Sequence, residues 1–188
     1  MISAVVLAAD RPRPGGEVPF LESFRGKPVL QRVLETALRS DADEVICVVR
    51  DLAQARAHIP LVNDKLSWVI DYGADHGKSH ALVAGLWAID PSSGGAVFLN
   101  GDQPTVSRNI INGLIDRFVH TSALIVVSTI ASQPRYPILF RRELFPELLK
   151  LRGEQDGRQL IESSGRTDFM AADERAMFAL ERARHMNN

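Results

Sequence analysis

The chain has 188 residues, enough for one well-packed domain and short for two. Its 45% hydrophobic and 24% charged residues are ordinary for a soluble globular protein. The formal net charge of -1 at pH 7 gives no reason to expect nonspecific binding to nucleic acid or to a membrane surface. We therefore expect a single domain over residues 1–188, with neither nucleic acid nor a membrane among its partners.

Short apolar runs separated by turn residues predict the strands. The first run, residues 2–9, has no basic segment before it and is too short to span a bilayer, so it predicts a strand and not a signal peptide. The single cysteine, Cys47, lies in another apolar run and is typical of a buried thiol in a reducing compartment. We therefore expect a cytoplasmic protein. The other predicted strands are residues 45–49, 68–70, 96–99, 123–127 and a short edge strand at 138–140, after Pro137.

Helical spacing of apolar residues appears between these runs. In residues 28–38, apolar side chains recur on one helical face, and a proline stands at the first turn. The alternation of strands and helices predicts an α/β fold in three layers, with helices on both faces of a mostly parallel sheet. The other predicted helices are residues 79–89, 110–119, 143–151, 160–163 and 173–184. Trp68 and Trp87 fall within these elements and are expected in the core.

The segment 96–104 carries the clearest functional signal. Its apolar residues run without alternation into the turn Gly101-Asp102-Gln103-Pro104, as in a strand buried on both faces of a parallel sheet. Ligands of open α/β sheets bind just beyond the carboxyl ends of the strands. A carboxylate in that place suits Mg²⁺, which usually takes one or two carboxylates plus substrate phosphates. Asp102 is therefore the predicted metal ligand; the alternative is that it only caps the helix beginning near Ser107.

A second acidic and histidine-rich stretch is open to two interpretations. His76 and His80 are four residues apart, with Asp71 and Asp75 just upstream. Histidines at that spacing can share a transition metal. However, Gly77 lies between them and the spacing gives no third ligand, so exposed loop residues are the alternative.

Four blocks of the sequence together resemble the MobA-like nucleotidyltransferase family, and within it the molybdenum cofactor cytidylyltransferase branch. Leu7-Ala8-Ala9 keeps the opening of the family's phosphate loop, and Gly16 is in register with the second glycine of that loop. The segment from Gly77 to Leu86 resembles the family's Gly-x-Ser-Ser-Ser-Leu-x-x-Gly-Leu, and Gly101-Asp102-Gln103-Pro104 resembles its Mg²⁺-binding turn. Tyr136-Pro137-Ile138-Leu139-Phe140 and the segment 153–161 are similar to the family's acceptor-side blocks.

The resemblance implies a Rossmann-like nucleotidyltransferase domain. Its function would be to transfer a nucleotidyl group, CMP as the first expectation, from CTP or GTP to molybdopterin or a related phosphorylated acceptor. Mg²⁺ would be the cofactor, and a molybdoenzyme or maturation protein would be a further partner. The resemblance makes Asp102 catalytic and lets Arg13, by a slip of one place, stand in for a missing family arginine. The nucleotide-binding residues that it implies are Leu7, Ala8, Ala9, Gly16, Asp71, Gly77 and Ser79, and the acceptor-binding residues are Tyr136, Pro137 and Arg158.

The phosphate loop departs from the family pattern at four positions. Asp10 replaces a glycine, Pro12 a serine, Pro14 an arginine and Pro19 a lysine. Proline removes an N–H donor, and the lost basic residues would have stabilised charge at the transferred phosphorus. Lys78 has no counterpart in the family pattern; it either replaces part of that charge or is an ordinary solvated lysine at a helix start. The alternative function is therefore a catalytically degenerate relative that binds a cofactor or a partner protein without transferring a nucleotidyl group.

Overall fold

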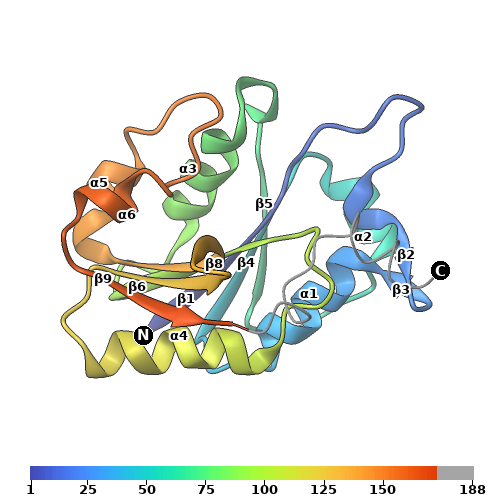
Figure 1. Ribbon diagram of the computed structural model, residues 1–188. Helices are drawn as coiled ribbons and strands as arrows, with labels where there is room; N and C mark the ends of the chain where they lie inside the picture. Colours follow the sequence, from blue (N-terminus) through green and yellow to red (C-terminus); the bar gives the residue numbers. More distant parts are fainter. Residues whose placement is uncertain (173–188) are drawn as a thin grey trace.

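The computed structural model describes residues 1–172, and a seven-stranded sheet in the order β5-β4-β1-β6-β8-β7-β9 runs through its centre (Figure 1). Strand β8 is antiparallel to both of its neighbours, and the other neighbouring pairs are parallel. The expected mostly parallel sheet is therefore confirmed. The strands of this sheet are β1 (Ile2–Ala8), β4 (Glu44–Val49), β5 (Leu66–Ile70), β6 (Gly95–Asn100), β7 (Ile125–Ile130), β8 (Gln133–Arg141) and β9 (Thr167–Ala171). A small hairpin joins β2 (Ser23–Phe24) to β3 (Lys27–Pro28).

Helices cover both faces of the sheet, which confirms the three-layer α/β/α architecture (Figure 1). One face carries α1 (Val29–Leu38), α2 (Leu52–His58) and α4 (Arg108–His120). The other carries α3 (Lys78–Ala88), α5 (Phe145–Leu148) and α6 (Leu160–Ser163). Short 3-10 turns complete the described elements: η1 (Pro19–Leu21), η2 (Ala74–His76) and η3 (Arg142–Leu144).

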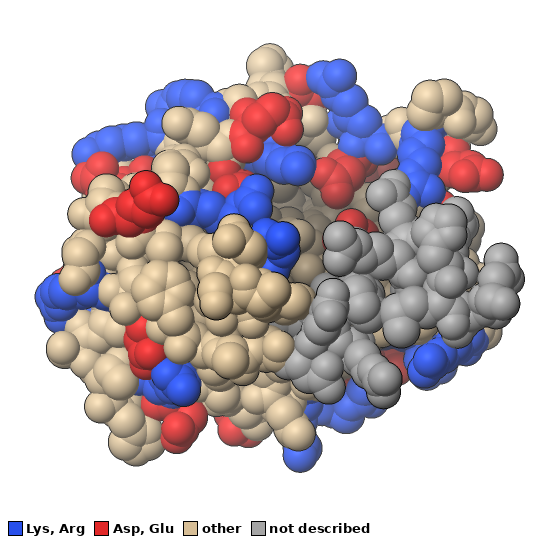
Figure 2. Space-filling model, in the orientation of Figure 1, with Lys and Arg blue, Asp and Glu red and all other residues tan. Residues whose placement is uncertain are grey.

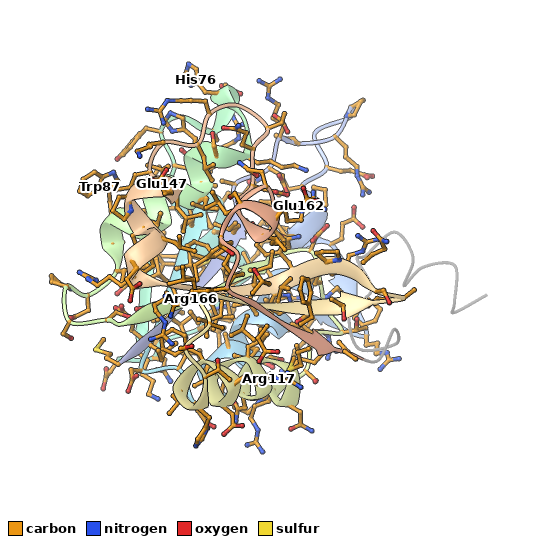
Figure 3. All side chains as sticks on the ribbon, turned by 60° about the vertical axis from the view of Figure 1, so that its left-hand side comes forward. His76, Trp87, Arg117, Glu147, Glu162 and Arg166 are labelled. Atoms are coloured by element: carbon orange, nitrogen blue, oxygen red, sulfur yellow. The ribbon has the colours of Figure 1, made fainter. Side chains whose placement is uncertain are left out.

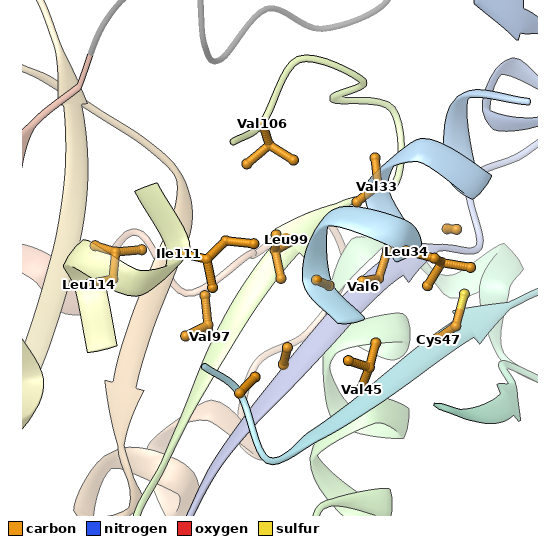
Figure 4. Close-up of a cluster of buried hydrophobic side chains, with 14 of the residues drawn as sticks. Val6, Val33, Leu34, Val45, Cys47, Val97, Leu99, Val106, Ile111 and Leu114 are labelled. Carbon is orange, nitrogen blue, oxygen red and sulfur yellow. The ribbon is translucent and has the colours of Figure 1, made fainter. Parts of the chain in front are cut away.

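The sheet is buried on both faces, which explains why the sequences of its strands are unbroken apolar runs. Successive residues of a strand point to opposite faces, so Val6 packs in the core beneath α1 and α4, whereas Val5 packs in the core beneath α3. Figure 4 shows the first of these cores, which includes Val6, Leu99 and Leu34 of α1. Cys47 is fully buried there and behaves as a small apolar side chain.

The prediction of an edge strand at 138–140 is wrong, because β8 lies between β6 and β7. Proline is usually excluded from interior strands since it lacks an N–H group. Here the pairing of β7 with β8 jumps from Val127–Ile138 to Ser128–Arg135, which leaves Tyr136 and Pro137 in a bulge. The bulge accommodates the proline without breaking the ladder on either side.

Some other elements also differ from the expectations. The helix expected over 143–151 is the short pair η3 and α5, while α2 and β9 were not predicted at all. The helix expected over 173–184 lies outside the described residues. Trp68 packs against the core as expected, but Trp87 is 76% exposed on the surface of α3 (Figure 3). No helix within residues 1–172 is long and apolar enough to cross a bilayer.

Candidate functional site

A cleft of about 390 Å³ opens at the carboxyl edge of the sheet. The strands β1, β5 and β6 are parallel, so the residues that follow them converge at this edge. The lining includes five carboxylates and four basic side chains. On the molecular face seen in Figure 2, acidic and basic side chains are likewise interspersed without a large patch of one sign. The polar residues that line the cleft are Asp10, Arg11, Asp71, Lys78, Asn100, Asp102, Gln103, Arg135, Tyr136, Glu154, Asp156 and Arg158.

Asp102 reaches this cleft because the turn after β6 is drawn tightly against β1. The N–H of Gly101 donates to the carbonyl of Leu7 over 2.7 Å. A Cβ atom at Gly101 would lie 2.8 Å from the Cβ of Ala8, so only glycine fits without movement. Asp102 is half-buried beside this contact. The cap of α4 is Ser107, whose hydroxyl accepts from the N–H of Ile110, so a residue other than Asp102 serves as the N-cap of α4.

The side chains around Asp102 offer the oxygen ligands that a hard cation requires. The carboxylates of Asp10 and Asp71 and the amides of Asn100 and Gln103 line the same cleft. Within residues 1–172, no group of three or more His, Cys, Asp or Glu side chains could enclose a metal ion. This donor set fits Mg²⁺, which keeps several waters and takes substrate phosphates as further ligands.

The histidine-rich stretch lies beside the cleft. The rings of His76 and His80 are 5.4 Å apart, and the Nδ1 atom of His80 lies 3.4 Å from Oδ1 of Asp71. A third ligand for a transition metal is missing from the described residues around this pair. The geometry therefore gives no support to the metal interpretation of His76 and His80.

The nucleotide-side predictions fall into two groups. Leu7, Ala9, Asp71 and Gly77 line the cleft. Ala8 and Ser79 are buried next to it, and the N–H of Ser79 donates to the carbonyl of Gly153 over 3.0 Å.

Two residues of the loop after β1 lie apart from the cleft lining. Gly16 is exposed, and it borders shallow grooves beside α2. The guanidinium of Arg13 forms an ion pair with Glu22, with Nη1 and Oε1 3.2 Å apart. The structure therefore pairs Arg13 with Glu22 and does not bring it into the lining with Asp102.

Unsatisfied polar atoms concentrate at this edge of the sheet. Oδ1 of Asp71 accepts from the N–H of Gly73, but Oδ2 has no partner although the side chain is only 1% exposed. Oε1 of Gln103 and Nε of Arg50 are also buried without a partner. Of the four such atoms among the described residues, only that of Ser128 is elsewhere. Buried polar groups are normally hydrogen-bonded, so the clustering indicates groups that a ligand or water completes.

The acceptor-side predictions converge on the loop 153–158. Tyr136 is buried, and its hydroxyl donates to the carbonyl of Asp156. Nη2 of Arg158 lies 2.8 Å from Oδ2 of Asp156, and hydrogen bonding to that carboxylate raises the pKa of Arg158. Burial raises the pKa of the Tyr136 phenol, which therefore stays protonated. Tyr136 and Arg158 line the cleft, whereas Pro137 lies outside the lining.

Several lining residues had no assigned role in the sequence analysis. Asn100 and Gln103 flank Asp102 at the same strand end, so the strand-end rule that found Asp102 could have found them as well. Arg135 and Glu154 come from distant segments, and their approach depends on the bulge in β8 and on the path of the loop 153–158. No local sequence signal points to these two.

The α/β sheet with an acidic turn at its carboxyl edge is an architecture that many proteins share, and the comparison with protein families identifies the family. Residues 4–168 match the MobA-like NTP transferase domain. The chain therefore belongs to this family of nucleotidyltransferases, and the resemblance drawn from its sequence is confirmed.

The chain is also similar to named relatives and to solved structures. The purine catabolism protein PucB of Bacillus subtilis is 28% identical over 166 residues, which cover 85% of this chain and 80% of that protein. A probable molybdenum cofactor guanylyltransferase of Methanosarcina acetivorans is 33% identical over 61% of this chain and 52% of that protein. The crystal structure of Rv0371c from Mycobacterium tuberculosis is 27% identical and covers 99% of this chain and 96% of its own, with a TM-score of 0.82. A second structure of Rv0371c, in complex with manganese, is 26% identical, covers 98% of this chain and 96% of its own, and has a TM-score of 0.78.

Proposed function

We propose that this protein catalyses the Mg²⁺-dependent transfer of a nucleotidyl group from CTP or GTP to molybdopterin or a closely related phosphorylated acceptor. The observation that carries the proposal is that Asp102 lines one cleft together with the residues assigned to the nucleotide and those assigned to the acceptor. The relatives named as molybdenum cofactor guanylyltransferases support this acceptor, and they favour GTP over the CTP expected from the sequence. The manganese complex of Rv0371c supports a divalent cation.

In this mechanism, Asp102 would hold the Mg²⁺ ion, with further oxygen ligands from the phosphates. The ion would supply positive charge against the phosphate oxygens during transfer. Tyr136 and Arg158 would orient the acceptor so that its phosphate oxygen lies in line with the α-phosphorus of the nucleotide. A bond forms from that oxygen to the α-phosphorus while the bond to the leaving pyrophosphate breaks. The attacking phosphate is already anionic, so the step needs no general base.

We assign Asp71 to nucleotide binding, because its unpartnered Oδ2 is an acceptor that a base or ribose donor can complete. Asp71→Asn keeps the shape and the bond from Gly73 but removes the charge. We expect the KM for the nucleotide to rise about tenfold with little change in kcat, since hydrogen bonds to charged groups contribute about 1.5–3 kcal/mol. The midpoint of urea unfolding should not fall, because a buried carboxylate oxygen without a partner is itself unfavourable. A lower kcat with an unchanged KM would contradict this assignment.

The proposal is tested by incubating the protein with Mg²⁺, GTP or CTP and purified molybdopterin. We expect release of pyrophosphate and a dinucleotide product whose mass equals that of the acceptor plus GMP or CMP minus one water molecule. The degenerate alternative has a specific observation in its favour, because Arg13 is paired with Glu22 instead of lining the cleft. Binding of nucleotide and acceptor without release of pyrophosphate would establish that alternative.

A further inference from the structure

Lys78 differs from the other basic residues of the cleft in its partners. Arg11 is tied to Asp75, with Nη2 2.6 Å from the backbone carbonyl and Nε 3.4 Å from Oδ1. Arg158 is paired with Asp156, and Arg135 donates to the carbonyl of Pro134. The ammonium group of Lys78 has no ion pair or hydrogen bond with any described residue, although five carboxylates share the cleft with it.

Lys78 also lies where the two halves of the cleft meet. It is the first residue of α3 and follows Gly77, which packs so closely on the loop 153–158 that an added Cβ would lie 2.4 Å from the carbonyl of Gly153. On the nucleotide side, the charge of Lys78 acts on Asp10. Burial raises the pKa of Asp10, the Lys78 ammonium lowers it, and the Glu154 carboxylate raises it. Lys78 is therefore positioned between the loop after β1 and the loop 153–158.

A cation without a carboxylate partner would offset negative charge that the reaction brings into this junction. Transfer brings an acceptor phosphate and a triphosphate together in a space that already holds five carboxylates. The loop after β1 has prolines where basic residues would stand, and Arg13 is held by Glu22. Arg11 and Arg158 are held by carboxylate partners and Arg135 by the Pro134 carbonyl, whereas Lys78 has no such partner among the described residues.

We propose that Lys78 is the phosphate-binding cation of this cleft, with its ammonium group donating to phosphate oxygens where the nucleotide and the acceptor phosphate meet. It replaces, from the opposite wall, the basic residues that the loop after β1 lacks. The ammonium group offsets negative charge as pyrophosphate departs. This inference rests on the proposed function, because it assigns a residue to that same transfer.

The single native cysteine makes a chemical rescue experiment possible. In Lys78→Cys, the new thiol is at an exposed position, whereas Cys47 is fully buried and burial raises the pKa of its thiol, which keeps it unreactive. Alkylation with bromoethylamine then adds an aminoethyl group and restores a lysine-like ammonium at residue 78 only. We expect kcat/KM to fall about 100-fold in the variant, as when one charge-stabilising donor is removed, and to recover at least tenfold after alkylation.

Lys150→Cys is the matched control. Lys150 is also exposed and pairs with Glu147 at 2.6 Å, but it does not line the cleft. Its kcat/KM should stay within about twofold of wild type before and after alkylation. Mass spectrometry counts the aminoethyl groups, and one should be added to each variant.

The outcomes separate the two proposals. A wild-type protein that produces no dinucleotide with GTP or CTP overturns the proposed function, and the role of Lys78 falls with it. An active wild type with a Lys78→Cys variant of near-normal kcat/KM overturns the role of Lys78 alone. Loss of activity that the aminoethyl group does not restore also overturns it, because the effect would then not come from the missing charge.

Discussion

Asp102→Asn is expected to lower metal-dependent turnover by about three powers of ten while leaving the fold intact. The carboxylate is the proposed Mg²⁺ ligand at the end of β6, and an amide oxygen binds the ion far more weakly. A metal ion supplies several kcal/mol of stabilisation to phosphoryl-type transition states, and about 1.4 kcal/mol corresponds to a tenfold change in rate. Asp102 is half-buried at the edge of the sheet, so an isosteric amide should not disturb the cores.

The measurement is the rate of pyrophosphate release at saturating nucleotide, with circular dichroism and thermal unfolding to verify the fold. Asp116→Asn is the control, because Asp116 is a 72% exposed carboxylate of α4 whose partner is His120. It should retain wild-type turnover. Turnover of Asp102→Asn within a few fold of wild type would remove Asp102 from the metal site.

Gly77→Ala should destabilise the protein by about 2–6 kcal/mol and lower turnover as well. Gly77 has a φ of 103° and a ψ of 175°, a backbone region that is essentially restricted to glycine and costs other residues about 1–3 kcal/mol. Its new Cβ would lie 2.4 Å from the backbone of Gly153, and relieving such overpacking typically costs about 1–3 kcal/mol more. To relieve this steric contact, the loop 153–158 has to move away from α3. That movement breaks the hydrogen bond from the N–H of Ser79 to the carbonyl of Gly153 and displaces Asp156 and Arg158.

Gly153→Ala is the matched control, because it also has a positive φ, 59°, but its Cβ would meet no atom within 4 Å. Urea unfolding should therefore show a loss of only about 1–2 kcal/mol, the cost of a left-handed backbone conformation without a steric clash. If the two variants lose equal free energy of unfolding, the close packing of Gly77 on Gly153 does not hold the loop 153–158 in place.

The parts of the fold that the sequence predicts well are those with one dominant physical cause. Strands β1, β4 and β6 are buried on both faces, so burial alone produces their unbroken apolar runs. Helix α2 was missed because it buries only Ala55 and is set by the side-chain cap of Asp51, which leaves almost no apolar periodicity. Strand β8 was misplaced at an edge because its prolines suggest an edge, whereas a bulge accommodates Pro137 in the interior.

The candidate site also contains some residues that a local sequence signal predicts and others that it does not. Asp102 was predicted because strand ends of parallel sheets are where ligands bind, and the structure places it in the cleft. The assignment of Arg13 depends on aligning a loop that departs from the family pattern. In the structure, Arg13 forms an ion pair with Glu22. For Lys78, the sequence leaves two interpretations open. In the structure, the path of the loop 153–158 brings Lys78 to the junction of the cleft. Residues that meet through long-range packing leave no local trace in the sequence.

The most direct test of the nucleotidyltransferase assignment is calorimetric titration of GTP, CTP and ATP into the folded protein, with Mg²⁺ and with EDTA. We predict saturable binding of GTP or CTP that requires Mg²⁺ and is lost in Asp102→Asn. No heat of binding from any of the three nucleotides up to millimolar concentration, with the fold verified by circular dichroism, would contradict the account and favour a relative without transferase activity.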